Sequence, residues 1–131
     1  MAKYLIASLF LLLLSSGFAE NEAYYRSIFA KLVSGKEEVT LADKTRCDVV
    51  TDTHAIEVEF ANKWTEGLGQ SLWYAFQTDK KAGIVLILKD EKDRRFLIRL
   101  QSLIRHRKLN DVTVWTISKS GQIDKQELLS K

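Results

Sequence analysis

The chain has 131 residues, one cysteine, no proline and a formal net charge of +3. Hydrophobic residues make up 46% of it and charged residues 28%, a composition that is typical of a globular domain and excludes a disordered or collagen-like chain. Its single cysteine, Cys47, excludes an internal disulfide framework and any zinc or iron–sulfur site built from several cysteines. This length predicts one domain.

The N-terminal segment, residues 1–19, has the layout of a secretory signal peptide. Lys3 precedes an apolar segment, and the small residues Gly17 and Ala19 follow it. The apolar segment has about eleven residues, whereas a membrane-spanning helix needs about twenty. We therefore expect cleavage before Glu20, an exported protein that is periplasmic or secreted, and one domain over residues 20–131. An uncleaved N-terminal anchor is the alternative.

The rest of the chain predicts alternating helices and strands. The clearest strand is 55–61, because Ile56, Val58 and Phe60 alternate with the residues of the other face. The predicted elements in chain order are a helix over 21–33, strands over 39–41, 46–50 and 55–61, a helix after Thr65, a strand over 84–88, a helix over 93–107 and a strand over 112–117. From Ser120 on we expect a polar tail. This order, α-β-β-β-α-β-α-β, predicts an α/β domain.

Two carboxylates on the clearest strand are the first candidates for chemistry. Glu57 and Glu59 are two residues apart, so both point to one face, roughly 6–7 Å apart. A hairpin before this strand would bring Asp48 alongside them. Three neighbouring carboxylates repel one another unless a cation lies among them, and hard oxygen ligands suit Mg²⁺ or Mn²⁺. The alternative is a strand with one solvated face, on which glutamate is common.

Asp48, then Glu57-Val58-Glu59, then Gln70-x-x-x-Tyr74 on the next helix resembles the pattern of the PD-(D/E)XK nuclease superfamily. The resemblance covers about residues 22–117. It implies a three-layer restriction-endonuclease-like fold, in which a mixed central sheet is flanked by helices. It also implies that Asp48, Glu57 and Glu59 hold Mg²⁺ or Mn²⁺. Gln70 and Tyr74, which share a helix face, would contact the metal-site strand or a substrate phosphate.

The sequence departs from the superfamily pattern at one position. Glu59 stands where the motif lysine usually stands, and that lysine is thought to position or activate the attacking water. Some restriction enzymes of the superfamily have glutamate there. Lys63, four residues further along, is a candidate to supply the missing charge, and a surface lysine is the alternative. Glu22 lies where some members of the superfamily place another acid.

The function that the resemblance implies is hydrolysis of phosphodiester bonds in DNA or RNA by a metal-activated water. The alternative is an exported, non-catalytic module that binds nucleic acid or protein and keeps the nuclease fold. A third interpretation is a secreted structural or partner-binding protein with a solvated acidic strand face. The chain has no P-loop, no GxGxxG turn and no HExxH helix, which excludes the functions those motifs support.

Several other features have two interpretations each. Residues 89–108 carry eight basic side chains against three acidic ones, which indicates either a surface for a polyanion or a solvated helix face. Trp64, Trp73 and Trp115 either stack on bases or pack in the core, and we favour packing. His54 is either an auxiliary base or an ordinary turn residue.

Overall fold

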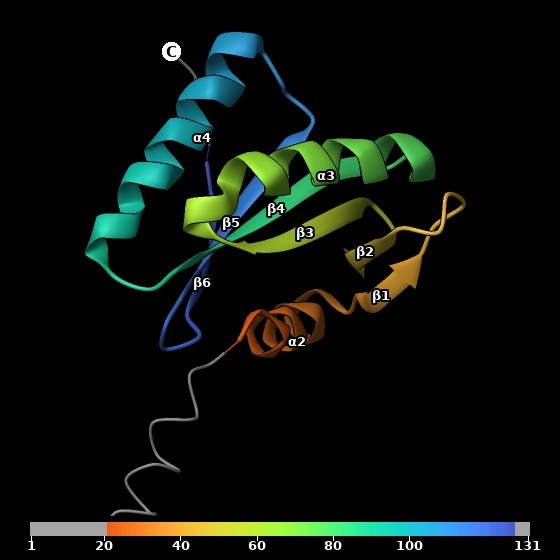
Figure 1. Cartoon of the computed structure of the whole chain (residues 1–131), viewed down its shortest axis with the longest axis horizontal. Coiled ribbons are helices and arrows are strands. Elements are labelled where there is room, and N and C mark those ends of the chain that lie inside the picture. The colour runs from red at the N-terminus through yellow and green to blue at the C-terminus, as the bar shows by residue number, and fades with distance from the viewer. Residues whose placement is uncertain (1–20, 128–131) are drawn as a thin grey trace, which may run out of the picture.

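A six-stranded mixed β-sheet forms the middle layer of the computed structural model, which describes residues 21–127 (Figure 1). Neighbouring strands in the sheet are also neighbours in the chain. The elements are α2 Glu22–Val33, β1 Lys36–Thr40, β2 Arg46–Val50, β3 His54–Phe60, the 3₁₀ turn η1 Ala61–Lys63, α3 Trp64–Thr78, β4 Lys81–Leu88, the 3₁₀ turn η2 Glu91–Asp93, α4 Arg94–Arg107, β5 Val112–Ser118 and β6 Ile123–Gln126. The expected signal peptide lies outside the described residues.

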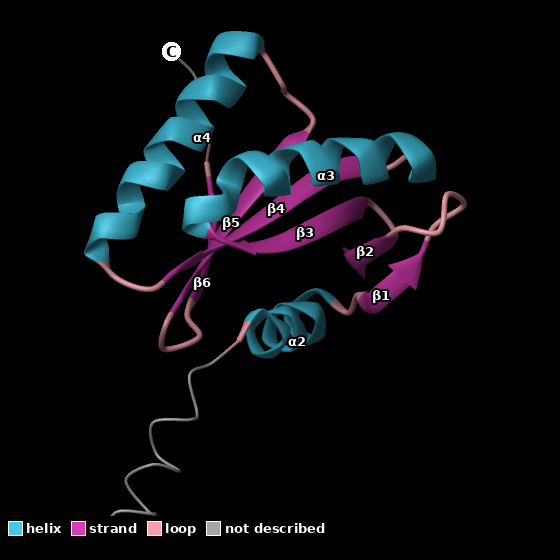
Figure 2. Ribbon diagram, viewed as in Figure 1, coloured by secondary structure: helices cyan, strands magenta, loops and turns pink. Residues whose placement is uncertain are grey.

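The connections between the strands determine which face each helix covers (Figure 2). Strands β1, β2 and β3 are antiparallel, β3, β4 and β5 are parallel, and β6 is antiparallel to β5. Helix α3 joins β3 to β4, and α4 joins β4 to β5. Two right-handed crossovers that step in the same direction place both helices on one face of the sheet. Helix α2 covers the other face.

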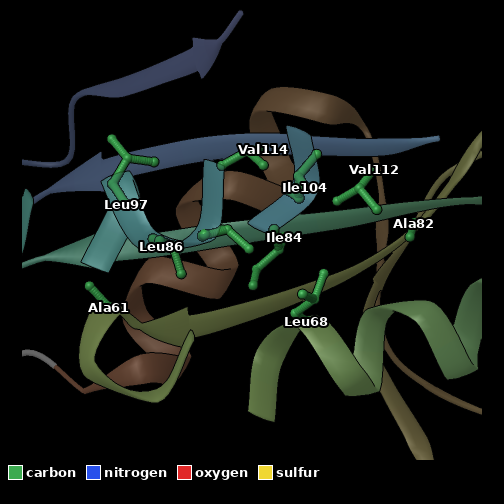
Figure 3. Close-up of a cluster of buried hydrophobic side chains, with 10 residues drawn as sticks. Ala61, Leu68, Ala82, Ile84, Leu86, Leu97, Ile104, Val112 and Val114 are labelled. Carbon is green, nitrogen blue, oxygen red and sulfur yellow. The ribbon is translucent and has the colours of Figure 1, made fainter. Parts of the chain in front are cut away.

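Both faces of strand β4 are buried, as its continuous apolar sequence predicts. Ile84 and Leu86 lie on the α3 and α4 face, where they pack in one cluster with Leu68 (Figure 3). Val85 lies on the opposite face and packs in a second cluster with Phe29 of α2. The sheet therefore separates two hydrophobic cores, and polar groups on either face must find partners or a ligand.

The predicted class, α/β with a mixed sheet flanked by helices, is confirmed, but the predicted order lacks its last strand. The chain turns at Gly121, which has a φ of 87°, and returns as β6, with Ile123 opposite Ile117. Because β6 is an edge strand with two of its four residues exposed, it carries too few apolar residues to produce a hydrophobic pattern. Within residues 21–127, no helix combines the length and apolarity needed to cross a membrane.

Candidate functional site

The two glutamates of β3 lie on the sheet face that α3 and α4 cover. Glu57 is opposite Ile84 of β4, and Glu59 is opposite Leu86. Glu57 is 4% exposed and Glu59 is 7% exposed. The interpretation of this face as a solvated acidic strand surface is therefore wrong, because a water-facing glutamate would not be covered by helices. Two buried carboxyl groups require hydrogen bonds, protons or a cation to offset the loss of water.

A local distortion of the sheet directs Asp48 toward Glu57. The residues on either side of Glu38 in β1 pair with the residues on either side of Asp48 in β2, but Glu38 and Asp48 are not paired with each other. Glu38 has a φ of 49°, which is unusual inside a strand. The Asp48 amide donates to Glu57 Oε1 at 3.4 Å, and Asp48 Oδ2 accepts from the Val58 amide at 2.9 Å. Side-chain oxygens of these two strands thus accept hydrogen bonds from backbone amides that would pair with backbone carbonyls in a regular β2–β3 ladder. Such irregularities commonly re-aim side chains beside active sites.

The Asp48 and Glu57 carboxyl groups form an acid pair that retains a proton. Burial raises the pKa of Glu57 to about 9, and the charge of Asp48 and a hydrogen bond to its carboxylate add to this effect. Burial also raises the pKa of Asp48, although the Val58 amide and the hydrogen bond from Glu57 oppose the shift. In the absence of a cation, the two neighbouring carboxyl groups therefore favour holding a proton between them.

Glu59 forms a second acidic contact, with Glu22 in the first turn of α2. Burial and the neighbouring Glu22 carboxyl group raise the pKa of Glu59 to about 8, while the positive charge of Lys63 lowers it. Asn21 caps this end of α2 by accepting a hydrogen bond from the Tyr24 amide at 3.1 Å. Glu59 Oε1 is buried and accepts no hydrogen bond from any described donor. One carboxylate oxygen at the site therefore lacks a partner.

Tyr74 of α3 joins the site, and Gln70 does not. The Tyr74 side chain is 6% exposed and packs with Cys47 and Ala55. Burial raises the pKa of the Tyr74 hydroxyl, and the carboxyl group of Glu57 raises it further. Gln70 lies one turn earlier and is exposed to water. The structure thus brings Asp48, Glu57 and Tyr74 together and leaves Gln70 on the surface.

A glycine allows α3 to lie directly against the carboxylates. A Cβ atom on Gly67 would stand 3.2 Å from Glu59 Cβ and 2.9 Å from Ile84 Cδ1. Gly67 is not among the residues that the sequence predicts for the site. A glycine inside a helical pattern is the signal that indicates a close approach.

His54 lies at the opposite end of β3 and does not act on the carboxylates. Its Nδ1 is 2.7 Å from Thr53 Oγ1, and its Nε2 is 2.8 Å from Thr113 Oγ1. Burial lowers the pKa of the imidazole. It lines a cavity of about 590 Å³ together with Lys36 and Trp115. The ring is held as a structural hydrogen-bonding group, so the interpretation as an auxiliary base is not supported.

The donor chemistry of the site fits a hard divalent cation, but its arrangement is not a ready-made cage. Carboxylate oxygens are the ligands that Mg²⁺ and Mn²⁺ prefer, and Glu59 Oε1 has no partner. Among residues 21–127, however, no three or more His, Cys, Asp or Glu side chains are grouped so as to hold a metal ion. A cation would therefore have to displace the proton shared by Asp48 and Glu57 and turn these side chains toward Glu59.

The chain was also compared with known proteins. No family model, no curated protein and no solved structure matches it.

Proposed function

We propose that this protein is an exported, metal-dependent nuclease that hydrolyses phosphodiester bonds in DNA or RNA, on a restriction-endonuclease-like fold. The observation that carries the proposal is the convergence of four acidic side chains from three elements: Glu22 from α2, Asp48 from β2, and Glu57 and Glu59 from β3. Burying several carboxyl groups together is costly, and a protein with no use for them would gain stability from apolar replacements.

The placement of these groups supports the proposed fold. Asp48 lies on the second strand of an α-β-β-β-α-β order, Glu57 and Glu59 lie on the third, and Tyr74 comes from the helix that follows. This is the placement that the resemblance to the PD-(D/E)XK superfamily implies. The appended α4, β5 and β6 extend the sheet on the side away from Asp48.

Asp48, Glu57 and Glu59 would hold Mg²⁺ or Mn²⁺. When bound, the ion would lower the pKa of a coordinated water and stabilise negative charge on the phosphate. The residues of the chain have distinct tasks in this scheme. Glu57 releases its proton, Asp48 keeps its backbone hydrogen bond from Val58 and so holds β2 in place, and Glu59 offers its free oxygen.

Lys63 supplies a positive charge where the motif lysine is replaced by Glu59. It lies at the end of η1, directly after β3, and its charge lowers the pKa of Glu59. A cation at this place would neutralise part of the carboxylate charge and attract a phosphate group. The Lys63 side chain is exposed to water and follows the end of the strand, so it acts on Glu59 through its charge and not from the strand position that the common motif uses.

Cleavage assays on labelled DNA and RNA with Mg²⁺ or Mn²⁺ test the proposal. We expect slow cleavage by the wild-type protein and none by Asp48→Asn or Glu57→Gln, while Glu66→Gln, an exposed acid on α3, keeps full activity. Glu59→Lys restores the common motif, so it should retain or raise activity if Asp48 and Glu57 suffice to hold the ion. Cleavage that survives both Asp48→Asn and Glu57→Gln would place the active site elsewhere.

A binding module without turnover is the second candidate. It is favoured by the glutamate at position 59 and by the lack of a ready-made metal-binding group among the described residues. The same assays separate the two candidates. A wild-type protein that binds nucleic acid and leaves every substrate intact in both metals would exclude the nuclease and retain the binding module.

A further inference from the structure

Two aromatic side chains are stacked on the water-facing surface of α3. The rings of Trp73 and Phe76 have centroids 5.6 Å apart and planes 22° apart. Trp73 is 49% exposed and Phe76 is 77% exposed. Trp64 and Trp115, in contrast, pack against the two hydrophobic cores, so the packing interpretation holds for these two and not for Trp73. We call Trp73 and Phe76 the aromatic platform.

A hydrogen bond from the platform to a neighbouring turn holds it in place. The Trp73 indole Nε1 donates to Asp43 Oδ2 at 2.9 Å. Asp43 remains ionised because hydrogen bonds from Thr45 and then Trp73 lower its pKa to about 2. The indole is therefore fixed from the β1–β2 side, and Phe76 stacks on the fixed ring. One face of the Phe76 ring contacts Trp73, and its high exposure leaves the rest accessible to a ligand.

The two helices on this side of the sheet have complementary characters. Helix α3 carries one charged residue, Glu66, in fifteen positions. Helix α4 carries five arginines and no acidic residue in fourteen positions. Arg95 and Arg99 place their guanidinium groups 4.7 and 5.6 Å from the ring centre of Phe96, which holds part of this positive charge on the helix surface. Helices α3 and α4 lie over the same face of the sheet (Figure 1). The aromatic side chains of α3 and the positive charge of α4 therefore belong to the same side of the molecule.

We propose that the aromatic platform binds an unpaired base, so that the protein takes single-stranded nucleic acid with its backbone along α4. This inference rests on the proposed function for the class of ligand, which is nucleic acid. It adds that the nucleic acid is single-stranded. A strand of nucleic acid needs rings for its bases and cations for its phosphates, and this face provides both. Asp43 places a negative charge on the β1 side of the platform, which favours a backbone path on the α4 side.

A duplex would not use these rings. Its bases are stacked on one another inside the helix, so an exposed phenyl ring reaches a base face only where the strands are separated or end. The platform therefore predicts a preference for single strands, and α4 predicts sensitivity to salt, since phosphate contacts release counterions.

Binding of fluorescein-labelled single-stranded and duplex oligonucleotides, measured by anisotropy in EDTA, tests the inference without cleavage. We expect the wild-type protein to bind the single strand more tightly, and Phe76→Ala to weaken that binding by about fivefold or more while duplex binding stays unchanged. Phe76→Trp should retain single-strand affinity. Leu72→Ala is the matched control, because Leu72 is an exposed apolar side chain on the same helix without a ring; it should leave affinity unchanged.

The outcomes distinguish this inference from the proposed function. Single-strand binding that depends on Phe76 supports the platform whether or not any variant cleaves. Equal loss in Phe76→Ala and Leu72→Ala, or no loss in either, would overturn it, even if the protein proves to be a nuclease. Sedimentation of the wild-type protein as a dimer that Phe76→Ala dissociates would also overturn it, because the rings would then be an interface between two copies.

Discussion

Among individual residues, Glu57 is one whose burial determines its chemistry. It is nearly inaccessible to water and lies against another carboxyl group, so its neutral form is favoured up to a pH of about 9. The same features that stabilise the proton would stabilise a cation in its place, because both relieve the repulsion between Asp48 and Glu57. Proton and metal therefore compete for one pair of side chains.

The stability of the metal-free protein should fall as pH rises. The pKa of Glu57 is about 9 in the folded chain and about 4.5 in an exposed glutamate. The contribution of neutral Glu57 to the free energy of unfolding is complete below about pH 4.5 and is lost as pH rises through 9. Over this range the free energy of unfolding falls by up to about 1.4 kcal/mol per pH unit. Urea denaturation in EDTA from pH 5 to pH 9 measures it. Glu57→Gln should reduce the slope and leave the part that is due to Glu59, whose pKa is also raised, whereas Glu66→Gln should leave the slope unchanged. Identical slopes in all three proteins would contradict the prediction.

Divalent cations should raise the melting temperature, because a ligand that binds the folded state alone stabilises it by mass action. We expect Mn²⁺ or Mg²⁺ to raise the Tm of the wild-type protein, and the rise to be larger at pH 8 than at pH 6, since binding must release the proton of Glu57. Glu57→Ala should abolish the rise. An unchanged rise in Glu57→Ala, measured by thermal denaturation, would locate the cation at other side chains.

At the scale of elements, the site depends on how closely α3 approaches β3. A Cβ atom on Gly67 would crowd Ile84 Cδ1 and the Cβ of Glu59, so the glycine lets the helix lie against the stem of the Glu59 side chain. Gly69, on the same helix, has no atom within 4 Å of the position where its Cβ would be. The two glycines have the same effect on helix propensity, and they differ in packing.

Substitution of each glycine by alanine separates packing from propensity. Gly69→Ala should stabilise the protein by about 0.5–1 kcal/mol, because alanine is the better helix former. Gly67→Ala should be less stable than Gly69→Ala by about 1–3 kcal/mol, because its methyl group crowds Glu59. It should also reduce the Tm response to Mn²⁺. Urea denaturation measures the stabilities, and equal stabilities for the two variants would show that the approach of α3 is not tight.

At the scale of the whole molecule, the sheet divides the chain into two sides with different roles. Helix α2 covers one side, and α3 and α4 cover the other, where the carboxylates, the aromatic platform and the arginines of α4 all occur. Glu22 is the exception, since it comes from the first turn of α2 and lies close to Glu59. The site is thus assembled from both layers.

The prediction of export concerns the N-terminal segment, residues 1–19. The apolar segment of residues 4–14 is too short to span a membrane, and Gly17-Phe18-Ala19 follows shortly after it. We expect the mature protein to begin at Glu20. Intact mass and N-terminal sequencing of protein from an exported fraction measure this directly. Met1 retained on protein from the cytoplasm would contradict it.

Local patterns in the sequence were enough to predict most of the order of elements and the common face of the two glutamates. Alternation of Ile56, Val58 and Phe60 is a local property with period two, so it places Glu57 and Glu59 on one face whatever the rest of the chain does. The alternation of helical and strand patterns predicts the α/β class for the same reason. Where the local pattern is weak, as in the polar strand β6 and in β1, which begins at Lys36 and not at residue 39, the prediction failed or shifted.

Packing between segments that are distant in the chain decided how the residues of the site behave. Burial of the acid face, the raised pKa values of Glu57 and Glu59, the proximity of Glu22 and the exposure of Gln70 all depend on it. The pKa of a carboxyl group depends on loss of water and on charges a few ångströms away, and neither is encoded in the spacing of its neighbours along the chain. Tertiary structure also decides the exposure of Trp73 and Phe76. The crossovers between strands determine which face of each helix packs against the sheet and which face remains in contact with water.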